Sequence, residues 1–212
     1  WLVAGRAARQ MVEERMSSSA QIAAESLPFF IETGQSLILD MASADLVLAP
    51  EEQAAALLAQ RLRSVPYFSQ LSLIDPGGEK ILAGYPEADF DRLGLTNEEK
   101  AGVKLAAHGV AVQTYAVPPK TGEIAAQVSF LALVRDSNGE VGGVLIGRTE
   151  LSTNPFTLPA IRALESIQNI RTTIHGEGVI LDENRQVLYP ASGQGLVQYP
   201  GDLPDQAGIF ED

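Results

Sequence analysis

The sequence contains no cysteine, two histidines and a single tryptophan among its 212 residues. Without cysteine the chain has no disulfide, no thiolate metal ligand and no cysteine nucleophile. Because His108 and His175 lie far apart in the sequence, a transition-metal site is not expected either. Asp89 begins a stretch that resembles a calcium loop, but Leu93 and Lys100 occupy its fifth and twelfth positions, so the EF-hand pattern fails. We expect no metal and no cofactor.

Positive charge is also scarce, since 15 Lys and Arg residues stand against 27 Asp and Glu, for a formal net charge of -12. Such a chain repels phosphate groups, and no local cluster of basic residues offsets the repulsion, so nucleic acid is not expected as a partner. The motifs of serine hydrolases, zinc proteases, phosphate-binding loops and dinucleotide-binding folds are missing. We therefore expect no enzyme, and a hydrolase with a site of unrecognised type is the remaining alternative in that class.

Long apolar runs are missing as well, because none reaches the roughly 18 residues that a membrane-spanning helix needs. The chain nevertheless starts with Trp1-Leu2-Val3-Ala4-Gly5, which is typical of the end of a membrane helix with Trp at the interface. We expect a membrane span before Trp1, and the alternative is a boundary inside a soluble protein. A content of 45% hydrophobic and 20% charged residues is that of a folded domain.

One motif occurs twice in the chain. Residues 73–86 give an apolar strand that ends at Asp75, a tight turn, a second apolar strand and a Tyr-Pro pair. Residues 180–190 repeat this order around Asp182. In each copy the Asp side chain can bond the turn backbone while polar or Gly residues reverse the chain. The repetition predicts tandem α/β sensor modules.

The N-terminal part of the chain has helical patterns. Residues 3–45 predict a long helix, which Pro28 and Gly34 should kink or divide in two. Pro50 should occupy the first position of a second helix, which ends at residues 64–66. A long helix that is only weakly apolar is not stable alone. We expect its apolar stripe to find a partner, and this makes the N-terminal helix the expected surface of a homodimer.

The middle of the chain is rich in strand signals, which predict strands at about 70–75, 80–85, 110–117, 123–135 and 141–150. Thr96 and Glu99 form a capping box that starts a short helix, and Gly109 should end it. Asn138-Gly139 between apolar runs is a strong hairpin signal. Five strands in hairpin order, preceded by helices, predict a PAS-like antiparallel sheet with helices on one side.

The last third of the chain should contain a connecting helix over residues 155–168, starting at Pro155, and a second hairpin module from Thr172. Too few residues remain for a full second sheet, so this module is either vestigial or truncated. Residues 191–212 are rich in Gly, Pro and Asp and are predicted to be loop.

This layout resembles an extracytoplasmic double Cache sensor domain, with tandem PAS-like modules. The matching parts are the long N-terminal helix, the stretch 66–75 with its Gly turn, the hairpin 129–147, the connecting helix and the second hairpin. The predicted fold class is α+β: a long N-terminal helix, a PAS-like antiparallel sheet (Cache) and a second, smaller or truncated PAS-like module. Residues 1–68 are predicted to form a helical stalk with the second helix, and residues 69–153 a membrane-distal PAS-like module. A connecting helix over residues 154–170 and an incomplete membrane-proximal PAS-like module over residues 171–212 should follow.

The resemblance implies a domain outside the cytoplasmic membrane, in the periplasm or extracellular space, that belongs to a bacterial transmembrane receptor and has transmembrane helices on both sides. The distal module of such domains usually binds a small-molecule ligand. Ligand binding is then expected to shift the connecting helix or the N-terminal helices, and the signal passes to a histidine kinase, chemoreceptor tail, cyclase or phosphatase. The alternative is a protein-interaction or structural domain of a membrane receptor without a small-molecule pocket.

The resemblance also singles out Arg148. The amino-acid-binding branch of the family has Arg-x-Trp-Tyr after the first hairpin and an Asp on the last strand of the distal sheet. This chain lacks Arg-x-Trp-Tyr, and Arg148 stands at the aligned position of that Asp. An Arg presents a bidentate fork to a carboxylate or phosphate, so the expected ligand is anionic or neutral. The alternative is a solvated strand-end charge or a salt bridge with Glu150.

Four further residues are candidates for the ligand-binding site: Tyr115, Ser129, Tyr67 and Tyr85. Each could place a polar tip on an apolar wall, as small-ligand sites require. The alternative for each is an ordinary half-buried strand residue. Since a slip of one residue in strand register moves every side chain to the other face of the sheet, the sequence does not decide between these interpretations.

Overall fold

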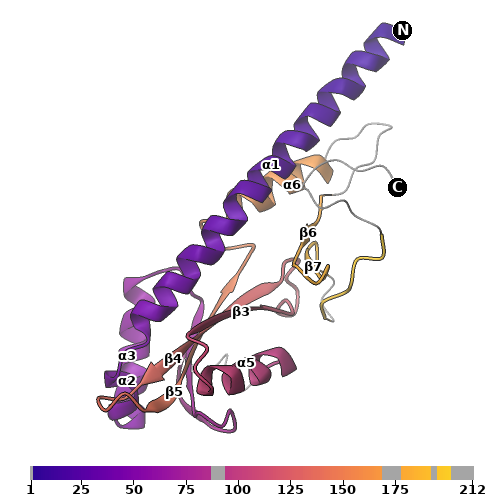
Figure 1. Cartoon of the computed structure of the whole chain (residues 1–212). Coiled ribbons are helices and arrows are strands. Elements are labelled where there is room, and N and C mark those ends of the chain that lie inside the picture. Colours follow the sequence, from indigo (N-terminus) through magenta and orange to yellow (C-terminus); the bar gives the residue numbers. More distant parts are fainter. Residues whose placement is uncertain (1, 87–93, 169–177, 192–194, 202–212) are drawn as a thin grey trace. The chain divides into compact units, whose positions relative to one another are not determined.

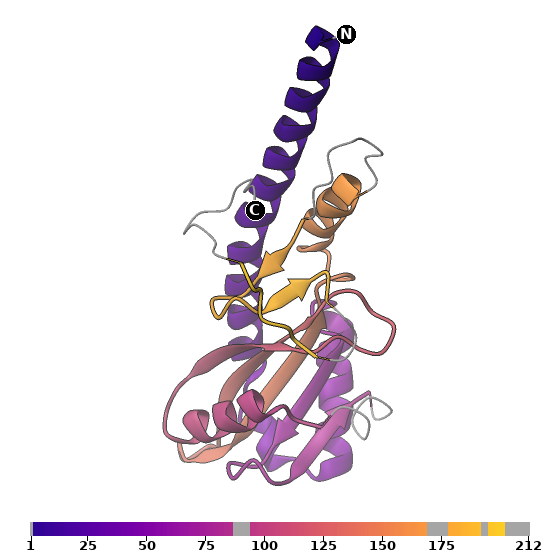
Figure 2. The same cartoon turned by 90° about the vertical axis from the view of Figure 1, so that its right-hand side faces the viewer.

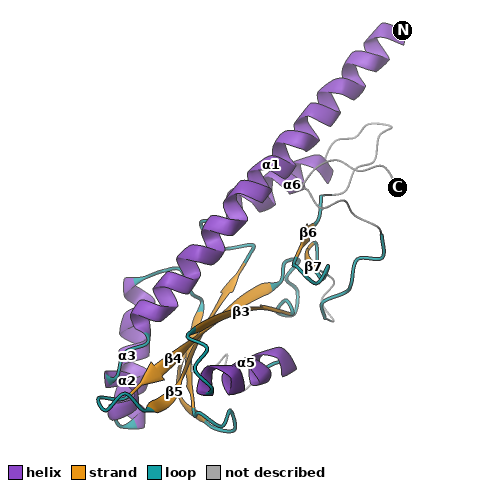
Figure 3. Ribbon diagram, viewed as in Figure 1, coloured by secondary structure: helices purple, strands orange, loops and turns teal. Residues whose placement is uncertain are grey.

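The computed structural model describes residues 2–86, 94–168, 178–191 and 195–201, whose elements are shown in Figures 1 and 3. The chain divides into two compact units. The sheet unit consists of residues 31–117 and 127–150, and the terminal unit consists of residues 1–30, 118–126 and 151–212. None of the described helices combines the length and the apolar character that crossing a membrane requires.

Helix α1 runs from Leu2 to Met41 and contributes residues to both units (Figure 1). Pro28 lies inside this one helix, so of the two expected effects, a kink or a division in two, the division is wrong. Gly34 does not end the helix because its role is close packing: a Cβ there would lie 2.4 Å from the ring of Phe130 on the sheet. Burial of α1 side chains such as Ile38 offsets the cost of a proline in a helix interior.

Two shorter helices follow, α2 from Asp45 to Leu48 and α3 from Glu51 to Ser64. The sequence pattern did not predict α2. Pro50 is the N-cap of α3 and precedes its first residue, one position earlier in the helix than predicted. Arg61 of α3 donates hydrogen bonds to the carbonyl of Met41, at the end of α1, and to Asp45 of α2 at 2.8 Å. The Arg61 side chain therefore links α1, α2 and α3 through hydrogen bonds.

The sheet unit contains a five-stranded antiparallel sheet in the order β2-β1-β5-β4-β3. Its strands are β1 Gln70–Ile74, β2 Ile81–Tyr85, β3 Val112–Val117, β4 Gln127–Arg135 and β5 Val141–Glu150. The predicted PAS-like α+β fold is confirmed. Strand β4 begins later than the predicted residue 123, because Ile124 and Ala126 hydrogen-bond instead with Ala191 and Leu188 of the terminal unit.

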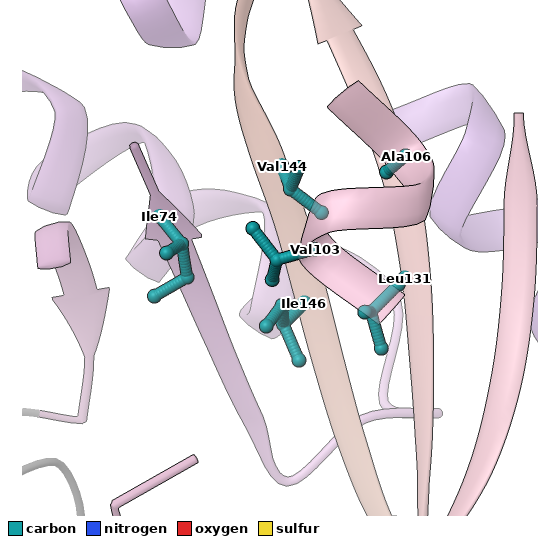
Figure 4. Packing of buried hydrophobic residues seen from close by; sticks show 6 residues of the cluster. All are labelled: Ile74, Val103, Ala106, Leu131, Val144 and Ile146. Carbon is teal, nitrogen blue, oxygen red and sulfur yellow. The ribbon is translucent and has the colours of Figure 1, made fainter. Parts of the chain in front are cut away.

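Helix α5, from Asn97 to Ala107, packs against strands β3, β4 and β5. The predicted capping box is present: Thr96 Oγ1 accepts from the Glu99 amide at 3.1 Å, and the Glu99 carboxylate accepts from the Thr96 amide at 2.8 Å. Figure 4 shows the apolar cluster between helix and sheet, formed by Ile74, Val103, Ala106, Leu131, Val144 and Ile146. Because α1 covers the opposite face through Gly34, helices lie on both faces of the sheet, not on one as predicted.

The described part of the terminal unit contains α6, from Leu158 to Gln168, and a hairpin of β6, Ile180–Leu181, with β7, Val187–Tyr189 (Figure 2). Helix α6 starts later than the predicted Pro155, because Asn154 holds the preceding residues in a turn, accepting from the Phe156 amide at 2.9 Å. Thr172, the predicted start of the second module, and most of the predicted loop 191–212 lie outside the described residues.

The repeated motif has the same local geometry in both copies. Asp75 accepts hydrogen bonds from the amides of Gly77 and Glu79, and Asp182 accepts from those of Asn184 and Gln186. The Asp side chain fixes the turn in each hairpin, as the sequence predicted. The peptide bond of the Tyr-Pro pair that ends each copy is cis.

Candidate functional site

Polar side chains form a row across four strands of the sheet. Gln70 on β1 lies directly opposite Arg148 on β5, Arg148 opposite Ser129 on β4, and Ser129 opposite Tyr115 on β3. Residues directly opposite each other share one face of a sheet. This face is the one that α5 covers, because a Cβ on Gly102 of α5 would lie 2.5 Å from the Tyr115 ring. We call these four residues the polar row and this side of the sheet the α5 face.

Arg148, at the centre of the polar row, forms a buried ion pair with Glu99 of α5. Its Nε donates to Glu99 Oε1 at 2.8 Å, and its Nη2 donates to Glu99 Oε2. The exposed fractions of the two side chains are 4% and 0%. Nη2 also donates to the carbonyl of Gly94 at 3.3 Å. Arg148 therefore has a counter-ion on helix α5, a pairing that the alternatives drawn from the sequence, a solvated charge or a salt bridge with Glu150, did not include.

Two atoms on either side of Arg148 lack hydrogen-bond partners within the described part of the chain: Gln70 Oε1 and Ser129 Oγ. Both residues are buried, with exposed fractions of 3% and 0%. Buried polar atoms are normally paired, and an unpaired one reduces stability by roughly 1–3 kcal/mol. Two such atoms flanking one guanidinium indicate a position where an ordered water or a bound small molecule completes the hydrogen bonding.

Tyr115 on β3 is the last residue of the polar row. Its hydroxyl donates to Gln113 Oε1 at 2.6 Å, and Gln113 Nε2 donates to the carbonyl of Gly102 in α5 at 2.9 Å. Burial raises the pKa of Tyr115, so its hydroxyl stays protonated and remains a donor at neutral pH. These bonds hold α5 against β3 at one end of the row.

The structure thus brings together three of the five predicted site residues, Arg148, Ser129 and Tyr115. The other two lie elsewhere. Tyr67 is buried on the opposite face, where its ring lies 4.9 Å from that of Phe68 and 5.9 Å from that of Phe130, measured between centroids. Tyr85, on β2, lines a shallow hollow of about 290 Å³ against α3. Neither tyrosine shares the surroundings of Arg148.

A larger open hollow, of about 460 Å³, lies in the sheet unit between α1, α2 and α3. Two of its charged side chains pair with each other, since Asp45 binds Arg61 at 2.8 Å. Burial tends to raise the pKa of Asp45, but hydrogen bonds from Ser43 and Arg61 outweigh it and hold the pKa below its usual value. Neither hollow includes a residue of the polar row. Within the described residues, no group of three or more His, Cys, Asp or Glu could hold a metal ion.

Sequence reasoning missed two residues of this site. Glu99 was recognised as a helix cap, but nothing in the sequence showed that the same carboxylate reaches Arg148, 49 positions away. Gln70 did carry a signal, because it is a large polar residue at the start of a mainly apolar strand, and all five residues of this strand are buried. An amide in such a strand requires a partner, and this need alone could have nominated it.

The chain matches no protein-family model and no curated protein. It does match solved structures. The ligand-binding domain of the Pseudomonas aeruginosa PAO1 amino-acid chemoreceptor PctC, in complex with GABA, is 17% identical with a TM-score of 0.57, over 81% of this chain and 72% of that one. The ligand-binding domain of the Pseudomonas fluorescens chemoreceptor CtaA, in complex with L-isoleucine, is 20% identical with a TM-score of 0.52, over 94% and 79%.

A third structure, named methyl-accepting chemotaxis protein X, is 13% identical with a TM-score of 0.55, over 92% of this chain and 80% of that one. At such low identities the likeness establishes the fold. The chain has the fold of chemoreceptor ligand-binding domains, which agrees with the Cache-type sensor fold that the sequence predicted.

Proposed function

We propose that this chain is the extracytoplasmic sensor domain of a transmembrane signalling receptor and that it binds a small polar molecule at the polar row. The observation that carries the proposal is the pair of buried, unpartnered atoms, Gln70 Oε1 and Ser129 Oγ, on either side of Arg148. A fold shared with chemoreceptor domains solved with GABA and L-isoleucine supports the sensor role.

The chemistry of the row defines what the ligand must offer. Gln70 Oε1 is an acceptor, so the ligand needs an N–H or O–H donor for it. Ser129 Oγ can donate or accept and suits a hydroxyl, an amide or an amine. The apolar cluster of Figure 4, which includes Ile146 two residues before Arg148, would contact the apolar part of the ligand. A small molecule with one polar edge and one apolar edge fits this face.

The receptor context forms part of the same proposal: transmembrane helices flank the domain, and a histidine kinase, chemoreceptor, cyclase or phosphatase output receives the signal. The module boundaries after residues 68, 153 and 170 remain predictions. A homodimer through α1 is supported by Met11, Ile22 and Phe29, whose exposed fractions are 70%, 43% and 57%. Spacings of 11 and 7 residues place these three apolar side chains on one side of the helix.

A thermal-shift screen of the purified domain tests the proposal, with carboxylates, phosphates, amino acids, amines, sugars and purines at millimolar concentration. A ligand at a hundredfold excess over its Kd adds roughly 2.7 kcal/mol to the free energy of unfolding, and the melting temperature rises. The rise should disappear in Ser129→Ala. It should persist in Ser137→Ala, which changes an exposed serine in the turn between β4 and β5.

A melting temperature that no compound changes would contradict the proposal. Ordered water would then complete the polar row, and the protein-interaction domain, the alternative raised by the sequence, would become the better interpretation. A rise that survives Ser129→Ala would keep the sensor role but remove the ligand from the polar row.

A further inference from the structure

The Glu99 carboxylate takes part in two interactions at once, and its Oε2 atom is common to both. It accepts from the Nε and Nη2 groups of Arg148, and it accepts from the amide of Thr96 at the N-terminus of α5. Its side chain is 0% exposed. Glu99 is thus fixed in front of the guanidinium that the sequence had nominated to bind an anionic ligand.

We propose that Glu99 is a specificity-determining residue: as an internal counter-ion of Arg148, it makes the polar row select ligands without net negative charge. The inference rests on the proposed function, and it names the class of ligand that this site takes. Glu99 already accepts from Nε and Nη2 of Arg148 in a bidentate arrangement, so a carboxylate ligand cannot take this pair of donors while the ion pair stays intact. It would also meet the negative charge of Glu99 in a region shielded from water, where repulsion between charges is much stronger than in bulk solvent.

Glu99 has little freedom to move aside. Its backbone amide donates to Thr96 Oγ1 while its carboxylate accepts from the Thr96 amide, so turning the side chain away would break the cap of α5 as well as the ion pair. The ligand class that remains is polar and has no net negative charge, and it includes uncharged and zwitterionic molecules. Such a molecule can donate to Gln70 Oε1 and bind Ser129 Oγ while the ion pair stays intact.

Exchanging Glu99 for Gln tests the inference, because Gln has the same shape and is accepted in a capping box but carries no charge. The matched control is Glu98→Gln, which removes one charge from the neighbouring, exposed position of α5. The probe is succinate, and sodium chloride at equal ionic strength corrects for salt. We expect succinate to raise the melting temperature of Glu99→Gln but not that of the wild type or Glu98→Gln. The apparent affinity for succinate should increase at least tenfold.

Removing one partner of a buried ion pair is strongly destabilising, so Glu99→Gln could be unfolded without a probe. Circular dichroism then measures the folded fraction as succinate is added. Recovery of the folded fraction by succinate, beyond that in equal sodium chloride, supports the inference, and no recovery overturns it. The double variant Glu99→Gln, Arg148→Gln lacks both charges and should not respond to succinate. A response there would also overturn the inference, because the anion would be bound without Arg148.

Different results would contradict this inference and the proposed function. Wild-type domain that binds a sugar, purine or amino acid, while Glu99→Gln gains no affinity for succinate, would overturn the inference alone. A wild type that binds no compound in the screen would contradict the proposed function, whatever Glu99→Gln does.

Discussion

Ser129 and Phe130 are neighbours in the chain, both have exposed fractions of 0%, and they point to opposite faces of the same sheet. Phe130 packs against Tyr67 and Phe68 beneath α1, at 5.9 Å between ring centroids in both cases. Ser129 faces α5 with an oxygen that has no described hydrogen-bond partner. The two residues are equally buried but differ in their effect on stability. Phe130 stabilises the fold through its ring contacts, whereas Ser129 has a hydroxyl without a described hydrogen-bond partner.

The face beneath α1 is built for close contact. Gly34 of α1 and Gly147 of β5 leave room for aromatic rings, since a Cβ on Gly147 would lie 2.8 Å from Phe68. The α5 face has an apolar cluster at one end and buried polar groups at the other. The two faces therefore differ in their buried polar groups, and the polar end of the α5 face is the place where we propose that a ligand binds.

The largest effect is expected from Phe130→Ala. Removing a fully buried ring costs the transfer free energy of its atoms and leaves a cavity, so the free energy of unfolding should fall by about 3–5 kcal/mol. Urea unfolding followed by circular dichroism measures it. A loss below about 1 kcal/mol would mean that the aromatic packing beneath α1 does not hold the sheet unit together.

The next largest effect is expected from Gly34→Ala, which should lower the free energy of unfolding by about 1–3 kcal/mol because the new side chain overfills the space. In an open helix the same exchange would stabilise by roughly 1 kcal/mol. At this position the new Cβ would lie 2.4 Å from Phe130 and 2.7 Å from the Tyr67 hydroxyl. Adding Phe130→Leu to Gly34→Ala should recover part of the loss, in the same urea experiment. Stabilisation by Gly34→Ala alone would contradict the close approach of α1.

The third prediction compares Tyr67 with Tyr115 at alkaline pH. Burial raises the pKa of Tyr67 above its ordinary 10.0, although a hydrogen bond with the Gly34 backbone lowers it in part. The folded protein therefore keeps a proton that the unfolded chain loses above about pH 10. The free energy of unfolding is highest below that pH and falls as the pH rises further. Urea unfolding between pH 8 and 11 should show a smaller decline for Tyr67→Phe than for the wild type.

Tyr115 on the α5 face provides the control for this experiment. Burial raises its pKa too, but it is only partly buried, so Tyr115→Phe should change the alkaline decline less than Tyr67→Phe. Equal declines in the wild type and Tyr67→Phe would show that the Tyr67 hydroxyl is accessible to solvent.

The smallest effect on stability is expected from Ser129→Ala. Its hydroxyl has no described partner, so losing it should change the free energy of unfolding by less than about 0.5 kcal/mol, or raise it slightly. Because Phe130 is the next residue in the chain, Ser129→Ala and Phe130→Ala together compare the two faces of the sheet most directly. A loss above about 1.5 kcal/mol in urea would show that Ser129 has a structural bonding partner.

Local signals in the sequence predicted much of the fold. Asp75 and Asp182 bond the turn amides that they were expected to bond, and the Thr96 cap starts α5 where predicted. Tertiary packing determined the rest. Gly34 looks like a helix breaker in sequence, but it lies inside α1, where the absence of a Cβ leaves room for the ring of Phe130 and the hydroxyl of Tyr67.

The site was predictable only in part, because it depends on strand register. The family resemblance nominates Arg148, and residue type nominates Ser129 and Tyr115, but only their pairing across β5, β4 and β3 places these three on one face. Tyr67 lies on the other face, beside Phe130. The contact between Glu99 and Arg148 joins a helix to a strand 49 positions away. No local pattern encodes such a contact.

The central claim is that the ligand binds on the α5 face, and methyl NMR tests it most directly. The domain, labelled at Ile, Leu and Val methyl groups, is titrated with the compound that raises its melting temperature most. We predict that chemical shifts change first at Ile146 and Leu131, which lie on the α5 face beside the polar row. Changes confined to Leu71 and Leu73, whose side chains lie on the opposite face, would contradict the account.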